Sequence, residues 1–140
     1  MILISHRGNT EGPNTKRENS ISYIQEALDL GLDVEIDIWA KEQLWLGHDK
    51  AENPCPMKFL IQNFRHLWIH CKNLEAMDLL SEFKILNYFW HESDDFALTS
   101  KNFIWTYPGK RVSNKSVLVV GDARNLSLIH ISEPTRLRRI

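Results

Sequence analysis

Short apolar runs recur along the chain, separated by segments with helical spacing or by polar loops. Continuous apolar runs are typical of strands in a parallel sheet that is covered on both faces, because neither side of such a strand meets water. We expect strands at residues 2–5, 34–39, 66–73, 84–91, 102–109 and 116–122, and the run at 44–49 is expected to extend the second of these.

Helical spacing is clearest in two segments. Ser20 or Asn19 is placed to cap a helix that runs to Leu30, and Gly31 follows where glycine is favoured after a helix. A second helix is expected over residues 73–83, where apolar residues recur every three positions. Shorter helical stretches are expected at 58–63 and just before residue 100.

The alternation of strand and helix predicts an α/β fold with parallel strands and crossover helices. Two architectures fit this order, an open doubly wound sheet and a closed (β/α)8 barrel. A glycine-rich phosphate-binding loop does not follow the first strand, which disfavours a nucleotide-binding doubly wound sheet. In a barrel, functional residues are expected at the C-terminal ends of the strands.

Composition indicates an ordinary globular protein. The 140 residues suffice for one domain, 43% are hydrophobic, and the net charge of −1 implies no general attraction to nucleic acid or to an anionic membrane. No segment approaches the ~20 apolar residues of a membrane-spanning helix. Two cysteines and no signal peptide favour reduced thiols in a cytoplasmic protein. Four tryptophans are expected to pack in the core rather than to wall a pocket, namely Trp39, Trp45, Trp90 and Trp105.

Polar residues gather near the ends of the predicted strands. The second strand carries Glu35 and Asp37 on one face, because alternate residues of a strand point to the same side. On a solvated strand these carboxylates would face water, whereas inside a parallel barrel they would need a bound cation to offset the cost of burial. We favour the metal interpretation, and oxygen ligands suggest a hard ion, Mg²⁺ or Ca²⁺.

Two histidines, His6 and His48, follow the ends of neighbouring strands. A single histidine at a strand end is more often structural, but two beside a carboxylate pair suit general acid–base catalysis. Arg7 supplies a planar cation that matches a phosphate group. A metal, an arginine and two histidines together indicate phosphate-ester chemistry without a nucleotide. Three weaker candidates near another strand end are His91, Asp94 and Asp95.

Four short motifs occur in order along the first fifty residues. They are H-R-G at 6–8, E-N-S at 18–20, E-I-D at 35–37 and G-H-D at 47–49. Taken together with their spacing, they resemble the glycerophosphodiester phosphodiesterases, a family of the phospholipase-C-like phosphodiesterase superfamily, over residues 1 to about 125. The resemblance implies a (β/α)8 barrel and metal-dependent hydrolysis of glycerophosphodiesters to glycerol 3-phosphate and an alcohol.

The resemblance also implies a role for each matching residue. His6 and His48 correspond to the acid–base pair, Glu35 and Asp37 to metal ligands, Arg7 and Lys72 to contacts with the substrate phosphate, and Glu18 to a glutamate near the site. His70 stands where the family usually has a glutamate, and we include it as a third metal ligand. A neutral histidine leaves less negative charge, which would weaken Mg²⁺ or Ca²⁺ binding or favour another metal.

The chain is short for the architecture that its motifs imply. A complete (β/α)8 barrel usually needs about 200–250 residues, and we expect six strands before residue 123. An incomplete TIM-barrel domain is therefore expected over residues 1–125, with exposed sheet edges. Residues 126–140 are expected to supply no further strand. Their sequence resembles a translated sequencing-adapter read-through, and a natural basic C-terminal helix is the alternative.

Other functions remain open on the same residues. The substrate could instead be a phosphoinositide or a sphingolipid-type phosphodiester. The domain could bind a phosphate ligand without turnover, which the histidine at position 70 favours, or the chain could be an inactive fragment of a phosphodiesterase. The expected partner of an intact site is a small-molecule phosphodiester, with no nucleic acid and no membrane span.

Overall fold

The computed structural model describes residues 2–120 and 136–139 of the chain, and these contain ten strands and three helices. None of the three helices is long and apolar enough to cross a membrane. In chain order the elements are β1 (Ile2–His6), α1 (Ile21–Asp29), β2 (Asp33–Ala40), β3 (Leu44–Leu46), β4 (Asn53–Pro54), α2 (Met57–Gln62), β5 (Leu67–Cys71), α3 (Leu74–Ser81), β6 (Tyr88–Phe89), β7 (Phe96–Leu98), β8 (Ile104–Thr106), β9 (Ser116–Val120) and β10 (Arg136–Arg139).

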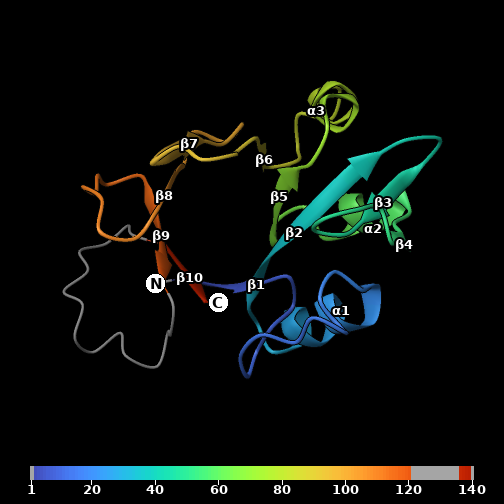
Figure 1. Cartoon of the computed structure of the whole chain (residues 1–140), viewed down its shortest axis with the longest axis horizontal. Helices are drawn as coiled ribbons and strands as arrows, with labels where there is room; N and C mark the ends of the chain where they lie inside the picture. Colours follow the sequence, from blue (N-terminus) through green and yellow to red (C-terminus); the bar gives the residue numbers. More distant parts are fainter. Residues whose placement is uncertain (1, 121–135, 140) are drawn as a thin grey trace.

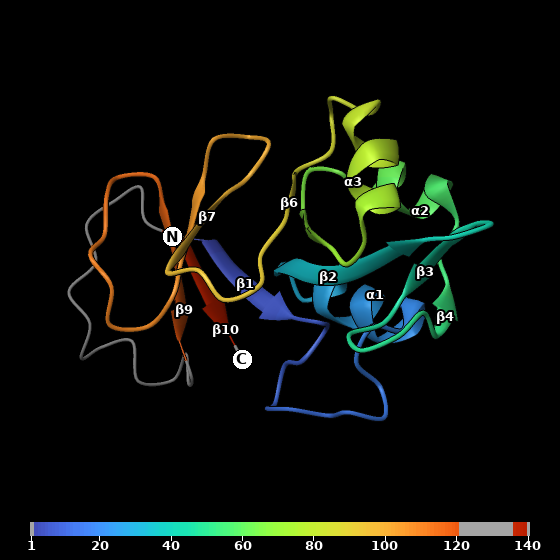
Figure 2. The same ribbon diagram turned by 45° about the horizontal axis from the view of Figure 1, so that its top comes forward.

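The strands pair edge to edge in the order β6-β5-β2-β1-β10-β9-β8-β7 (Figure 1). Neighbours from β6 to β8 run parallel, and β7 is antiparallel to β8. β3 forms an antiparallel hairpin with the end of β2, and β4 pairs with β3 (Figure 2). β1 pairs with the start of β2, at residues 33–35, and β3 pairs with its end, at residues 38–40. Neither strand pairs with Asp37 between them, and the backbone N–H of Asp37 donates instead to the Asn19 side chain.

The predicted (β/α)8 barrel is wrong. β6 and β7 form the two ends of the strand series, and within residues 2–120 and 136–139 no ladder joins them. The three helices lie beside β2 and β5 (Figure 1), and the connections from β6 to β9 contain no helix. The alternation of strand and helix therefore stops after α3, and the result is an open mixed sheet.

The sequence after α3 explains why the alternation stops. Phe96 and Leu98 are exposed while Ala97 between them is buried, and this two-residue alternation forms β7 where a helical stretch is predicted. The strand predicted at 84–91 is shortened to β6. The run at 44–49 turns back as β3 instead of extending β2.

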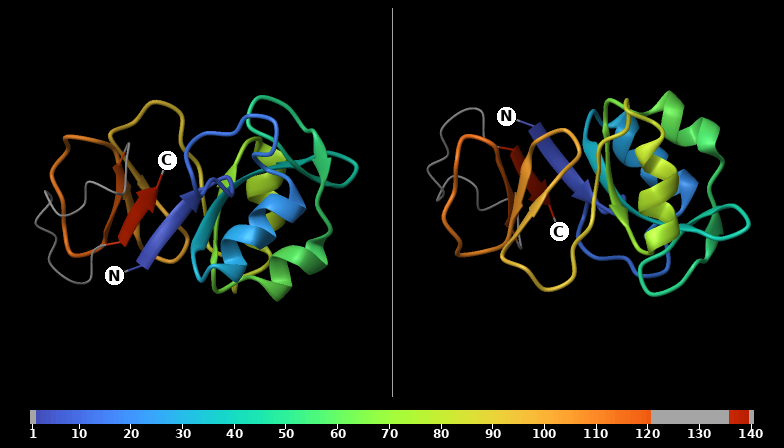
Figure 3. Two further views of the ribbon diagram at one scale, coloured as in Figure 1. Left: turned by 90° about the horizontal axis from the view of Figure 1, so that it is seen from below. Right: turned by 90° about the horizontal axis from the view of Figure 1, so that it is seen from above.

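The C-terminal segment also differs from the prediction where it is described. β10 lies parallel to β1 and to β9 and occupies the position between them, although no strand is predicted there. Figure 3 shows β1 and β10 side by side. Residues 126–135 and 140 of the predicted tail lie outside the described residues, as do the last two positions of the strand predicted at 116–122.

Alternate residues of β2 separate two environments. Val34, Ile36 and Ile38 are fully buried in the core that the helices share with β2 and β5. Glu35 and Asp37 lie between them in sequence and therefore point to the opposite face. A second buried cluster lies on that face of the sheet, and its members include Ile4, Trp68, Phe89 and Trp105.

Candidate active site

Strand register brings the predicted polar residues together. His6 at the end of β1 lies opposite Glu35 of β2, and Asp37 of β2 lies opposite His70 of β5. Residues in register on neighbouring strands project to the same face of the sheet. The four side chains therefore converge near the C-terminal ends of three parallel strands, on the face that the helices do not cover.

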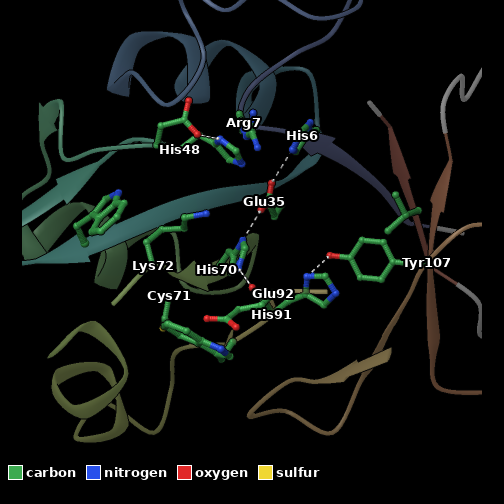
Figure 4. A pocket seen from close by; sticks show the side chains of 14 residues that line it. His6, Arg7, Glu35, His48, His70, Cys71, Lys72, His91, Glu92 and Tyr107 are labelled. Atoms are coloured by element: carbon green, nitrogen blue, oxygen red, sulfur yellow. Dashed lines mark hydrogen bonds and ion pairs between the residues drawn. The ribbon is translucent and has the colours of Figure 1, made fainter. Parts of the chain in front are cut away.

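A cavity of about 630 Å³ opens at these strand ends. Figure 4 shows Glu35 between His6 and His70, with Arg7 and Lys72 nearby. Six of the eight residues singled out from the sequence line the cavity, namely His6, Arg7, Glu35, His48, His70 and Lys72. The other two, Asp37 and Glu18, lie behind this wall in contact with Arg7.

Glu35, Asp37 and His70 form a compact group of possible metal ligands. Each offers one ligand atom within 4.8 Å of the other two. His70 Nδ1 is 3.1 Å from Asp37 Oδ1 and 3.8 Å from Glu35 Oε1. On the other side, His6 Nε2 is 3.7 Å from Glu35 Oε2. The carboxylate side chains of Glu35 and Asp37 are 2% and 0% exposed, so their charges require compensation within the protein.

Asp37 is the most enclosed charge of the site. Arg7 Nε lies 2.9 Å from Asp37 Oδ2, and Asn19 Nδ2 donates to the same oxygen at 2.9 Å. Burial alone would raise the pKa of the Asp37 carboxyl, but the contact with His70, the charge of Arg7 and the hydrogen bond from Asn19 hold that pKa well below its usual value. Asp37 is therefore ionised at neutral pH.

The loop after β1 fixes the position of Arg7. Arg7 Nη1 lies 3.2 Å from Glu18 Oε2, and Asn9 Nδ2 donates to Glu18 Oε1 at 2.8 Å. Gly8 has a φ of 92°, and a Cβ at this position would lie 3.0 Å from the backbone of Tyr23. The glycine of the H-R-G motif therefore permits the turn that directs the guanidinium toward the carboxylates.

His48 reaches the cavity from the loop after β3. A Cβ at the preceding residue, Gly47, would lie 1.9 Å from the carbonyl oxygen of Lys50, so this tight turn requires glycine. His48 Nδ1 lies 2.7 Å from Asp49 Oδ1, and because a carboxylate can only accept, Nδ1 carries the hydrogen. The His48 side chain is 45% exposed and forms the rim of the cavity, whereas His6 is mostly buried.

The structure adds residues that the sequence reasoning did not single out. Asn19 binds both the carboxylate and the backbone N–H of Asp37, and its place inside the E-N-S motif is the signal that could have identified it. Trp39 and Trp90 line the cavity, against the expectation that they pack in the core. Trp105 is fully buried in the second apolar cluster, as expected.

His91 and Tyr107 form another part of the cavity wall. The Tyr107 hydroxyl lies 2.9 Å from His91 Nδ1, and the two rings stack with centroids 4.1 Å apart. His91 Nε2 donates to the carbonyl oxygen of Asp94 at 2.7 Å. Asp95 pairs with Lys110 and does not line the cavity. Of the three weaker candidates, the His91 side chain alone is part of the cavity wall within the described residues.

The permanent charges of the site leave a net negative charge. Three carboxylates, those of Glu18, Glu35 and Asp37, accompany two permanent cations, Arg7 and Lys72, whose Nζ is 4.0 Å from Asp37 Oδ1. This set is one positive charge short before any charge on a histidine is counted. Two carboxylates and an imidazole are also ligand types that divalent metals use in proteins. The arrangement can therefore hold a cation at a cavity that three further histidines also line, namely His6, His48 and His91.

No family model, no curated protein and no solved structure matches the chain.

Proposed function

We propose that the chain is a metal-dependent phosphoric diester hydrolase of the glycerophosphodiester phosphodiesterase type. It would cleave glycerophosphodiesters to glycerol 3-phosphate and an alcohol. The observation that carries this proposal is the convergence of Glu35, Asp37 and His70 within 4.8 Å at a cavity lined also by His6 and Arg7. Residues from all four sequence motifs line this cavity or contact its wall, which supports a shared role.

The metal and the phosphate would be held by different groups. Glu35, Asp37 and His70 would hold a divalent cation, for which the resemblance implies Mg²⁺ or Ca²⁺. A cation bound there would offset the negative charge that builds up on the phosphate oxygens during cleavage. Arg7 and Lys72, which line the cavity as permanent cations, would bind the substrate phosphate.

The two histidines would move the protons. In the hydrolysis, a water oxygen bonds to phosphorus as the bond from phosphorus to the alcohol oxygen breaks, so one proton must leave the attacking water and another must reach the leaving oxygen. Asp49 holds the Nδ1 hydrogen of His48, which leaves the lone pair of the neutral ring on Nε2, and we assign His48 as the base. Glu35, 3.7 Å from His6 Nε2, would stabilise a protonated ring, and we assign His6 as the acid.

The proposed enzyme would act on a small molecule in the cytoplasm. The cavity of about 630 Å³ suits a small-molecule substrate, and the net charge of −1 gives no support to a nucleic-acid partner. Cys55 and Cys71 are both free and buried, which supports a reducing, cytoplasmic environment.

Hydrolysis of glycerophosphocholine and of bis(p-nitrophenyl) phosphate by the full chain, with and without divalent metal, tests the proposal. We expect metal-dependent turnover that falls at least about 100-fold in His6→Ala and in Glu35→Gln. His66→Gln is the matched control, because His66 is 60% exposed and binds Asp33 away from the cavity. Unchanged turnover in the two site variants would reject their roles, and no turnover with any divalent metal would reject the hydrolase function.

A phosphate-binding protein without turnover is the second candidate. Arg7 and Lys72 both lie against Asp37, and His70 adds an imidazole rather than a third carboxylate to the ligand group. These features reduce the negative charge available to a hard metal ion and leave more positive charge for an anion. Calorimetric binding of glycerophosphocholine with no product after several hours would support this candidate over the first.

A further inference from the structure

The two ring nitrogens of His70 have different surroundings. Nε2 lies 3.0 Å from the backbone carbonyl oxygen of His91, and because a carbonyl can only accept, Nε2 carries a hydrogen. The ring stacks on Phe89, with centroids 5.1 Å apart and an angle of 6° between the planes. The ring is therefore fixed in position with Nδ1 directed at the carboxylates of Asp37 and Glu35.

This orientation needs a positive charge beside Nδ1. In the neutral ring, Nδ1 bears a lone pair, which would face Asp37 Oδ1 across 3.1 Å without a hydrogen between them. Either a second proton on the ring or a bound cation removes this repulsion. A histidine that binds a metal through one nitrogen almost always donates the other N–H to a carbonyl, a carboxylate or water. His70 shows that pattern, with the carbonyl of His91 as the acceptor.

We propose that the site prefers a first-row transition ion of the Zn²⁺ or Co²⁺ class over Mg²⁺ and Ca²⁺, with His70 Nδ1 as a direct ligand. This inference deepens the proposed function, rests on its metal site, and concerns the identity of the ion. Mg²⁺ and Ca²⁺ take oxygen ligands, whereas imidazole suits Zn²⁺ and its neighbours.

The composition of the ligand set supports this choice. Two carboxylates, Glu35 and Asp37, and one imidazole, His70, make a set of three protein ligands. Three protein ligands with an open position toward a cavity are typical of catalytic zinc sites. Glu35 and His70 line the cavity, so a substrate could reach an ion held there.

Binding measurements on the metal-stripped, tag-free full chain test the preference without relying on turnover. Calorimetry with Zn²⁺, Co²⁺, Mg²⁺ and Ca²⁺ should show one Zn²⁺ bound at least about 100-fold more tightly than Mg²⁺. His70→Glu replaces the nitrogen ligand with oxygen and should reduce the ratio of Zn²⁺ to Mg²⁺ affinity at least about tenfold. His66→Gln, which removes an exposed histidine away from the cavity, should leave the ratio unchanged.

Histidine-ring nitrogen NMR of the unaltered protein provides a second measurement that needs no variant. Zn²⁺ should shift the Nδ1 resonance of His70 while Nε2 keeps its hydrogen. An unshifted His70 resonance in the presence of bound Zn²⁺, or Mg²⁺ affinity equal to that of Zn²⁺, would overturn the inference. The former result would indicate that Zn²⁺ binds without His70.

The proposed function and this inference fail separately. Tight Zn²⁺ binding through His70 with no phosphodiester turnover would reject the hydrolase and keep the metal preference. Turnover that Mg²⁺ supports, together with Mg²⁺ affinity equal to that of Zn²⁺, would keep the hydrolase and reject the metal preference.

Discussion

Asn19→Ala is predicted to lower the free energy of unfolding by about 3–5 kcal/mol. The Asn19 side chain donates to Asp37 Oδ2 at 2.9 Å and accepts from the Asp37 backbone N–H at 3.1 Å. A hydrogen bond to a charged group contributes about 1.5–3 kcal/mol and a neutral one about 0.5–1.5 kcal/mol. Asn19 also has a φ of 56°, where alanine costs about 1 kcal/mol more than asparagine.

Urea unfolding of the metal-free protein, followed by tryptophan fluorescence, measures this loss. Asn19→Gly is the matched variant, because glycine removes the same two hydrogen bonds but tolerates the positive φ. It should be about 1 kcal/mol more stable than Asn19→Ala. If both variants unfold within about 0.5 kcal/mol of the unaltered protein, the hydrogen bonds to Asp37 do not stabilise the site as argued.

Three further predictions follow from the loops and the core. Burial raises the pKa of the Cys55 and Cys71 thiols to about 12, so at about pH 8.5 they should resist iodoacetamide in the folded protein and react once it is unfolded. The stability that these protonated thiols contribute is present below their ordinary pKa and is lost as pH rises toward 12. Equal alkylation rates in the folded and unfolded protein, measured by mass spectrometry, would contradict this. Gly47→Ala should destabilise the fold by about 1–3 kcal/mol in urea unfolding, because its Cβ would overlap the carbonyl of Lys50; unchanged stability would refute the overlap. Glu18→Gln should reduce kcat/KM for bis(p-nitrophenyl) phosphate about tenfold by weakening the contact that orients Arg7, and an unchanged value would mean that Glu18 does not position it.

The polar face of β2 could be predicted because it depends on local geometry alone. Side chains alternate along any strand, so apolar residues at 34, 36 and 38 place Glu35 and Asp37 together on the other face. His70 was singled out only through the family resemblance, because parallel pairing makes β2 and β5 neighbours but does not by itself fix the register that places His70 opposite Asp37. Asn19 was missed because its role depends on a positive φ and on a contact with a residue eighteen positions away.

The overall architecture could not be predicted in the same way. Closure of a barrel depends on how many strand–helix units follow one another, and the motifs of the first fifty residues carry no information about residues 90–120. β7 depends on alternation over three residues, too short to distinguish strand from helix by pattern. β10 is formed by Arg136–Arg139, whose charged sequence does not resemble the buried strands on either side.

The most direct test of the account is the location of a bound metal. Anomalous diffraction from crystals of the full chain soaked with Zn²⁺ should show one strong peak about 2.0–2.2 Å from His70 Nδ1 and from a carboxylate oxygen of both Glu35 and Asp37. No peak among these three side chains, or a peak at the exposed His66 alone, would contradict the claim that they form a metal site.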